Sequence, residues 1–173
     1  MVIAGCGFLG EAAAVFFSQN GWRVLAVSAG EASAARLREA GFDAVAADIT
    51  GDLTGIVRGW SGAEAVVHCA SSGRGGEDAY RAVYRDGLEN LIASLRPGRI
   101  LFTGSTSVYS QSDGSWVDEE SLAEPERATG RILREAERIA LEAGGVVARL
   151  AGLYGPGRSV LLRKFLDGTA VLE

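Results

Sequence analysis

The sequence predicts a doubly wound α/β fold, in which helices cover both faces of one parallel sheet in three layers. Six short runs of β-branched or apolar residues alternate along the chain with helix-like segments. This alternation indicates a parallel sheet, because parallel strands are joined by right-handed helical crossovers. The length of 173 residues fits one domain, since domains usually hold about 100 to 200 residues.

The expected elements follow one another in a regular order. Strands buried on both faces of a sheet are continuous apolar runs, and such runs lie at 1–4, 22–28, 43–47, 65–70, 99–103 and 145–150. Helical patterns fill the intervals and follow the last run, at 10–20, 31–40, 53–58, 78–95, 124–143 and 160–166. The longest irregular stretch, 106–123, follows a strand directly. We expect substrate chemistry there, because open α/β sheets bind ligands at the carboxyl ends of their strands.

The composition excludes several classes of protein. A net charge of −5 argues against a nucleic-acid-binding surface, and no apolar run approaches the roughly 20 residues of a membrane span. With one histidine, His68, and two cysteines, Cys6 and Cys69, we expect no metal site. The chain has no secretory signal, so we expect reduced thiols and a cytoplasmic protein. A small-molecule ligand fits these limits.

A glycine-rich turn follows the first expected strand. Gly5, Gly7 and Gly10 form a G-x-G-x-x-G array that precedes a helical pattern. In this position the first glycine permits a tight turn, the second lets the backbone approach a pyrophosphate, and the third lets helix and strand pack closely. The alternative is a tight turn with no ligand. We expect a Rossmann dinucleotide site formed by the turn residues Gly5, Cys6, Gly7, Phe8, Leu9 and Gly10.

The end of the second expected strand bears on the choice between NAD and NADP. NAD-binding turns usually carry an acidic residue about 20 residues after the glycines, where it binds the ribose. Ser28 occupies that place here, Glu31 comes three residues later, and Arg36 lies in the next expected helix. The missing acid favours NADP over NAD, with Ser28 at the cofactor. Glu31 and Arg36 are equally consistent with solvated helix residues.

Four further segments, in order, resemble a known superfamily. They are VVHCASS at 66–72, LFTGSTSVYS at 101–110, VDEESLAEPERATGRILREAE at 117–137 and VVARLAGLYGPGR at 146–158. The chain thereby resembles the extended and atypical short-chain dehydrogenase/reductases, of the NAD-dependent epimerase/dehydratase type. The resemblance implies an oxidoreductase or epimerase that acts on a sugar nucleotide or another small carbonyl compound. The alternative is an inactive dinucleotide sensor or regulatory scaffold.

The same resemblance assigns cofactor contacts to residues that follow the strands. It places Asp48 and Ile49 at the adenine ring, Ala70 and Ser71 at the nicotinamide ribose, and Leu153 at the cofactor. It also implies a homodimer through the long helices expected at 78–95 and 124–143. Members of the family carry a further substrate-binding part, so residues 1–173 are expected to be the dinucleotide-binding domain alone.

The chain carries only some of the catalytic residues that the resemblance implies. Ser105 matches the serine that hydrogen-bonds the substrate oxygen. The alignment puts Thr129 at the position of the family's tyrosine and Leu133 at that of its lysine, and the single lysine, Lys164, lies in another element. A threonine hydroxyl does not act as that base, and leucine supplies no charge. The usual acid/base pair is therefore absent from these positions.

Two other residues enter the hypothesis as alternatives. Tyr109 follows Ser105 by four residues and offers a replacement phenol, provided that Arg149 or Arg158 supplies the cation it needs. Its place in the S-x-x-V-Y pattern is more typical of a structural residue. His68 lies in the fourth expected strand, where a packed strand residue is the simpler interpretation.

Overall fold

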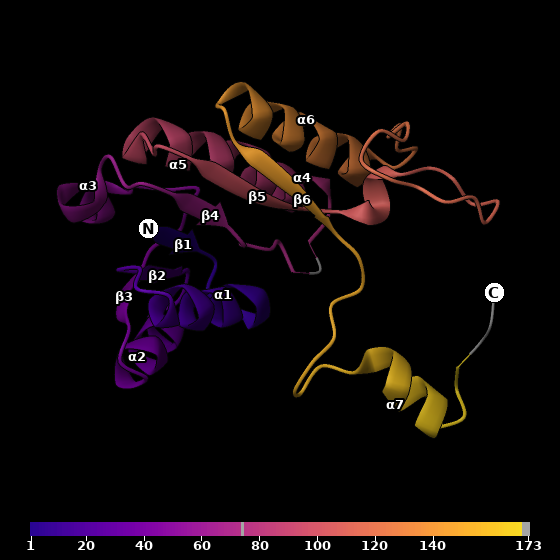
Figure 1. Cartoon of the computed structure of the whole chain (residues 1–173), viewed down its shortest axis with the longest axis horizontal. Helices are drawn as coiled ribbons and strands as arrows, with labels where there is room; N and C mark the ends of the chain where they lie inside the picture. The colour runs from indigo at the N-terminus through magenta and orange to yellow at the C-terminus, as the bar shows by residue number, and fades with distance from the viewer. Residues whose placement is uncertain (74, 171–173) are drawn as a thin grey trace.

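The computed structural model describes residues 1–73 and 75–170, and in these ranges six strands alternate with helices (Figure 1). The strands are β1 (Val2–Ala4), β2 (Leu25–Ser28), β3 (Asp43–Ala46), β4 (Val66–His68), β5 (Ile100–Ser105) and β6 (Val146–Leu150). The helices are α1 (Phe8–Gln19), α2 (Glu31–Glu39), α3 (Thr54–Trp60), α4 (Glu77–Tyr80), α5 (Gly87–Leu95), α6 (Ala128–Glu142) and α7 (Val160–Leu166). A π-helical segment, η1 (Arg81–Asp86), joins α4 to α5, and a 3₁₀ turn, η2 (Thr106–Val108), follows β5.

The strands form one parallel sheet in the order β3-β2-β1-β4-β5-β6. The chain runs outward from β1 to β3, returns to the centre at β4 and then continues to β6 at the other edge. This confirms the predicted doubly wound fold. The reversal between β1 and β4 opens a crevice at the carboxyl ends of these two strands, which is the usual ligand position in such sheets.

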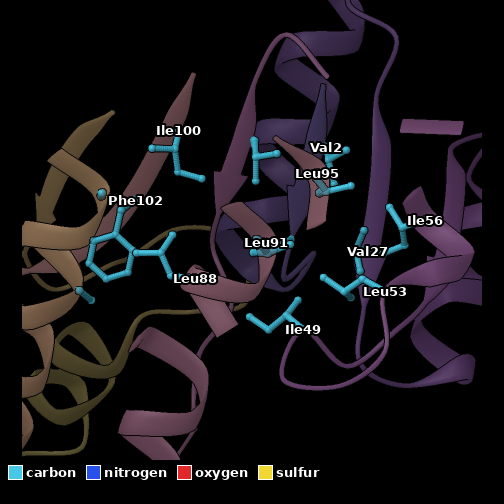
Figure 2. Close-up of a cluster of buried hydrophobic side chains, with 14 of the residues drawn as sticks. Val2, Val27, Ile49, Leu53, Ile56, Leu88, Leu91, Leu95, Ile100 and Phe102 are labelled. Atoms are coloured by element: carbon cyan, nitrogen blue, oxygen red, sulfur yellow. The ribbon is translucent and has the colours of Figure 1, made fainter. Parts of the chain in front are cut away.

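Helices bury both faces of the sheet, as the apolar strands require. Val2 and Val27 point to the face covered by α3, α5 and α6, where they share a core cluster with Ile56 and Leu91 (Figure 2). Ile3, between two residues that face the first cluster, belongs to the second one, on the side of α1 and α2. Figure 1 shows α5 and α6 on one side of the sheet and α1 and α2 on the other. The alternation along β1 follows from the two-residue period of a strand.

Three predicted strand boundaries were wrong by two or more residues. The predicted strand 65–70 ends at His68. The predicted strand 22–28 begins at Leu25, which lies opposite Val2, the first residue of β1. The predicted strand 99–103 continues to Ser105, because β6 pairs with it as far as Leu150. This extension comes from a neighbouring strand that lies far away in the sequence, so the local pattern gave no sign of it. It carries Ser105 to the last position of the strand.

The predicted helix 124–143 was also wrong at its start, since α6 begins at Ala128. Pro125 disfavours helical backbone at the residue before it, and its ring packs where a Cβ on Gly130 would lie, 2.5 Å from the Pro125 Cβ. The remaining helices lie within two residues of their predicted ends. The predicted helix 78–95 is present as α4, η1 and α5, and its π-helical middle was not predicted.

The chain leaves the sheet after β6. Residues 151–158 pass beside the start of α1, where the Arg158 guanidinium lies 5.2 Å from the centre of the Phe8 ring. Figure 1 shows α7 separated from the sheet by this extended segment. The side chains of Leu162, Phe165 and Leu166 in α7 are all exposed.

Candidate functional site

A cleft of about 490 Å³ lies at the carboxyl ends of β1, β4, β5 and β6. It is built from the glycine turn, the residues that follow β4, the end of β5 and the segment after β6. Eight of the residues that the sequence predicted for the site line this cleft: Gly5, Gly7, Phe8, Leu9, Ala70, Ser71, Ser105 and Leu153. The structure therefore brings together residues from four separate parts of the chain.

Six other predicted residues lie outside the lining. Cys6, Gly10, Ser28 and Ile49 are buried, and Asp48 is exposed after β3. The Asp48 carboxylate accepts hydrogen bonds from the backbone and hydroxyl of Thr50, both at 2.9 Å. Thr129 is half-buried in the first turn of α6 and does not line the cleft.

The glycine turn is shaped by close backbone contacts. Gly5 has a φ of +93°, and a Cβ there would lie 2.3 Å from the backbone of Ala70. A Cβ on Gly10 would lie 2.3 Å from the Gly5 carbonyl oxygen, whereas a Cβ on Gly7 would meet no atom within 4 Å. The first and third glycines thus allow the turn to pack, and the space beside the second is open.

The start of α1 fits the phosphates of a dinucleotide. No side chain caps this end of the helix, so its first backbone N–H groups have no partner within the helix or from a cap. Such a helix end carries partial positive charge and binds anions. The open space beside Gly7 lies at this end, where the Cβ of any larger residue would project. These two observations agree with a nicotinamide dinucleotide whose pyrophosphate lies over the turn.

Ser105 is placed to donate a hydrogen bond into the cleft. Its Oγ accepts a hydrogen bond from the backbone N–H of Ser107 at 3.1 Å, which fixes the oxygen at the start of η2. The hydroxyl keeps its own proton for another acceptor. The neighbouring Thr103 differs, because its hydroxyl already donates to the carbonyl oxygen of His68 at 2.8 Å.

Two tyrosines that the sequence analysis did not identify also line the cleft. Tyr80 and Tyr84 are one helical turn apart in α4 and η1, with ring centres 4.9 Å apart. The Tyr84 hydroxyl donates a hydrogen bond to the Ser71 Oγ at 3.4 Å, and burial raises the pKa of Tyr80. The i, i+4 spacing in the predicted helix 78–95 was the available signal, since such residues share a helix face.

The two residues that stand at the family's lysine and tyrosine positions lie in different places relative to the cleft. Leu133, at the lysine position, lines the cleft and is 3% exposed, so an apolar side chain occupies that part of the wall. Thr129, at the tyrosine position, remains outside the lining. Neither residue supplies a titratable group to the cleft.

Tyr109 lies outside the cleft, beside a second hollow on the β6 side of the molecule. Its hydroxyl donates to the Asp118 carbonyl oxygen at 2.6 Å and accepts from the Arg149 guanidinium at 2.7 Å. Of the two arginines considered as the cation for Tyr109, Arg149 is therefore the one that contacts its hydroxyl. The contact is structural, because the same hydroxyl is hydrogen-bonded to the irregular stretch after η2. Tyr109 is not among the residues that line the cleft together with Ser105.

Arg149 also belongs to a buried ion pair. Its guanidinium donates two hydrogen bonds to the Glu137 carboxylate, at 2.9 and 3.0 Å, and Arg134 pairs with the same carboxylate. Glu137 is 1% exposed. The carboxylate and the Tyr109 hydroxyl together raise the pKa of Arg149, so this cation stays charged and ties α6 to β6.

The two thiols and the imidazole near the cleft are neutral. Burial raises the pKa of Cys69, which lines the cleft, to about 11 and that of Cys6 to about 12, so both thiols keep their protons near neutral pH. His68 is fully buried, and burial lowers its pKa.

Within residues 1–73 and 75–170 no cluster of histidine, cysteine and acidic side chains could hold a metal. Nor do those residues include a helix long and apolar enough to cross a bilayer.

The residues considered for cofactor choice make ion pairs at the surface. The Arg36 guanidinium donates two hydrogen bonds to the Glu11 carboxylate, at 2.8 and 2.7 Å, and Arg38 pairs with Glu31. Ser28 is 6% exposed at the end of β2. No carboxylate follows β2 before Glu31 in the sequence.

Known proteins match this chain both in sequence and in fold. The model of the NAD dependent epimerase/dehydratase family matches residues 1–167. The protein YeeZ of Escherichia coli K12 is 30% identical over 166 residues, which cover 91% of this chain and 60% of YeeZ. The chain thus spans 60% of the length of the curated relatives that it matches.

Solved structures resemble the chain over nearly its whole length. A protein from Methylobacillus flagellatus, described as an NAD-dependent epimerase/dehydratase, has a TM-score of 0.77 at 29% identity, covering 94% of this chain and 57% of its own. The UDP-glucuronic acid 4-epimerase of Bacillus cereus, in complex with NAD, has a TM-score of 0.71 at 18% identity, covering 96% and 62%. The second likeness shows a shared fold.

Proposed function

Because the chain belongs to the NAD-dependent epimerase/dehydratase family, we propose that its cleft binds a nicotinamide dinucleotide and acts on a small carbonyl compound or sugar nucleotide. The observation that carries the proposal is the uncapped start of α1 with open space at Gly7, in the same cleft as Ser105. The complex of the Bacillus cereus epimerase with NAD supports the same ligand class. When bound, the dinucleotide would donate a hydride to the substrate or accept one from it.

Each part of the cleft has its own role in the proposed function. The N–H groups at the start of α1 bind the pyrophosphate, and Ala70 and Ser71 line the space next to the turn. The Ser105 hydroxyl donates a hydrogen bond to the substrate oxygen, where negative charge develops as the carbonyl is reduced. Leu153, in the segment after β6, lines the same cleft. Leu133 keeps the nearby wall apolar.

A dinucleotide-binding sensor is the second candidate. It is favoured by one observation: Leu133 presents an apolar side chain to the cleft and Thr129 lies outside it, so the usual acid and base are missing. In this case binding would persist without turnover. The two candidates share the cofactor site and differ only in chemistry at Ser105.

We further propose that NADP binds better than NAD. Ser28, with no carboxylate beside it, removes the group that usually binds the ribose hydroxyls of NAD. Arg36 is exposed and paired with Glu11 through a surface contact, and such contacts are weak enough to be exchanged for a ligand phosphate. A lower dissociation constant for NADPH than for NADH, measured by fluorescence titration, is the expected result. Equal constants, or a lower one for NADH, would contradict this preference.

We also propose that two copies pair through the face that carries α5 and α6, which lie side by side in Figure 1. Light scattering coupled to gel filtration should give a mass of about twice 18.0 kDa for the isolated chain. A mass of one chain at all concentrations would contradict this pairing.

The enzyme hypothesis is tested with reduced dinucleotide and a panel of aldehydes, ketones and keto-sugar nucleotides. We expect oxidation of NADPH or NADH with at least one carbonyl, and we expect Ser105→Ala to lower kcat by about 10²- to 10³-fold, as for other donors to a developing oxyanion. The affinity for the dinucleotide should stay unchanged. Ser110→Ala, at an exposed serine outside the cleft, is the matched control. Binding without turnover that depends on Ser105 would leave only the sensor.

A further inference from the structure

A single charged side chain lines the cleft. Among the described residues of the lining, only Arg158 carries a charged group, and the Cys69 thiol there keeps its proton because burial raises its pKa to about 11. The Arg158 guanidinium forms no ion pair with a described acidic side chain. Its positive charge is therefore not balanced by the protein, and a negatively charged group of a ligand would supply a partner.

A tight turn holds the backbone of Arg158. The backbone N–H of Gly155 donates to the Arg158 carbonyl oxygen, and the N–H of Arg158 donates to the Gly155 carbonyl oxygen, both at 2.9 Å. Pro156 and Gly157 lie between them, and the φ of +74° at Gly157 is typical of the third residue of a type II turn. The start of the Arg158 side chain is thus fixed before any ligand binds, which lowers the entropy lost on binding.

The ring of Phe8 lies between this turn and the backbone of α1. A Cβ on Gly155 would lie 3.0 Å from the Phe8 Cζ, the ring atom farthest from the helix backbone. The Arg158 guanidinium lies 5.2 Å from the centre of the same ring, and cations are attracted to aromatic faces at this distance. The pyrophosphate proposed above binds the backbone N–H groups of α1. The guanidinium therefore lies beside a side chain that those N–H groups do not need, and is free for a different anion.

The segment that leads to Arg158 begins beside Ser105. Leu150, the last residue of β6, lies opposite Ser105 in the sheet. Leu150, Leu153 and Arg158 all line the same cleft as Ser105. A substrate whose carbonyl oxygen meets Ser105 would lie along this segment, so Arg158 is placed to bind its far end.

We propose that Arg158 binds a negatively charged group of the substrate, a phosphate or a carboxylate, and thereby selects anionic carbonyl compounds. The inference rests on the proposed function and names the class of substrate for that same cleft. A guanidinium suits both groups, because its planar N–H donors form two parallel hydrogen bonds with either one. Neutral aldehydes and ketones lack this contact and are poorer substrates.

Turnover of matched substrate pairs tests the inference. The members of each pair differ in one negative group: an aldose phosphate with its free aldose, and a keto acid with its methyl ester. We expect Arg158→Met to lower kcat/KM for the anionic member by about 10- to 100-fold, the usual effect of a hydrogen bond to a charged group, mainly through KM. The neutral member should react as with the wild type. Arg158→Lys should keep part of the preference, since it retains the charge without the planar fork.

Anion binding gives a second measurement that needs no turnover. Inorganic phosphate and acetate are titrated by calorimetry into the chain saturated with NADH, so that the pyrophosphate position is already filled. We expect binding to the wild type and at least about tenfold weaker binding to Arg158→Met. Arg163→Met is the matched control, since Arg163 is exposed in α7 and lies outside the cleft lining. It should bind both anions like the wild type.

The outcomes separate the inference from the proposed function. Equal anion binding by the wild type and Arg158→Met, or no anion binding with an unchanged preference within the substrate pairs, overturns the inference alone. A matching loss of NADH affinity in Arg158→Met would assign the guanidinium to the pyrophosphate and also overturns it. Anion binding that depends on Arg158, without turnover of any carbonyl, supports the anion site and overturns the enzyme hypothesis. A wild-type chain that binds neither NADH nor NADPH overturns the proposed function together with the inference.

Discussion

At the scale of single residues, Gly10 shows how little room the glycine turn leaves. A Cβ there would lie 2.3 Å from the Gly5 carbonyl oxygen, whereas one on Gly59 in α3 would meet nothing within 4 Å. We expect Gly10→Ala to lower the free energy of unfolding by about 1–3 kcal/mol through overpacking. Gly59→Ala should raise it by about 0.5–1 kcal/mol through helix propensity. Urea unfolding measures both, and equal effects would contradict the packing of the turn.

His68 predicts how stability depends on pH. Burial lowers its folded pKa, so below about pH 6.5 the unfolded chain binds a proton that the folded chain does not. The free energy of unfolding should therefore fall as the pH drops below about 6.5, by up to about 1.4 kcal/mol per pH unit, until the folded pKa is reached. The chain has one histidine, so no other imidazole contributes.

The matched variant is His68→Gln, which keeps an N–H donor for the Val83 carbonyl. We expect its stability to vary much less between pH 5 and 7, measured by urea unfolding at several pH values. A pH dependence identical to that of the wild type would show that the titration belongs to another group.

The sequence predicted some cleft residues better than others, for physical reasons. Gly7 was found because a glycine turn between a strand and a helix is a local feature with fixed chemistry, and Ser105 was found through the family resemblance of its segment. Tyr84 was missed, because i, i+4 spacing shows which residues share a helix face but not what that face contacts. The contacts of that face depend on how η1 packs against β4, where the His68 ring of β4 is hydrogen-bonded to the Val83 carbonyl of η1. This contact joins distant parts of the chain.

At the scale of elements, a buried ion pair joins α6 to β6. Arg149 holds the Glu137 carboxylate, which is 1% exposed, with two hydrogen bonds. Removal of one partner leaves a buried charge without full compensation. We expect Arg149→Met to lower the free energy of unfolding by about 3 kcal/mol, measured by denaturant unfolding.

A second variant separates the buried charge from the lost packing. The double variant Arg149→Met with Glu137→Met should recover part of that loss, because it removes the uncompensated carboxylate. Arg138→Met is the control, since Arg138 forms an exposed pair with Glu142 and such pairs contribute little. A double variant less stable than the sum of the single effects would contradict the account.

Element boundaries were predicted less well than the elements themselves. The strand at 99–103 was recognised by its apolar run, but its last two residues exist as strand because Gly104 and Ser105 pair with β6. The start of α6 depends on how Pro125 packs against Gly130. Both are non-local effects, and both decide where residues near the cleft lie.

At the scale of the whole molecule, the fold follows from a few rules. Alternating strands and helices, with right-handed crossovers, leave few ways to arrange a parallel sheet. The structure has the order that places the glycine turn next to Ser71 at the reversal between β1 and β4. The course of 151–158 past Phe8 was not predictable, because this segment has no periodic pattern and its position depends on contacts with α1.

The central claim is that the cleft binds a nicotinamide dinucleotide with its pyrophosphate at the glycine turn. The most direct test is calorimetric titration of NADH and NADPH into the wild-type chain and into Gly7→Val. The new side chain meets no protein atom at its Cβ, so the unfolding temperature should stay close to that of the wild type while the side chain fills the phosphate space. The account predicts saturable binding to the wild type, weakened at least about tenfold, or about 1.4 kcal/mol, in Gly7→Val. Equal affinity in the two proteins, or no binding to the wild type, would contradict it.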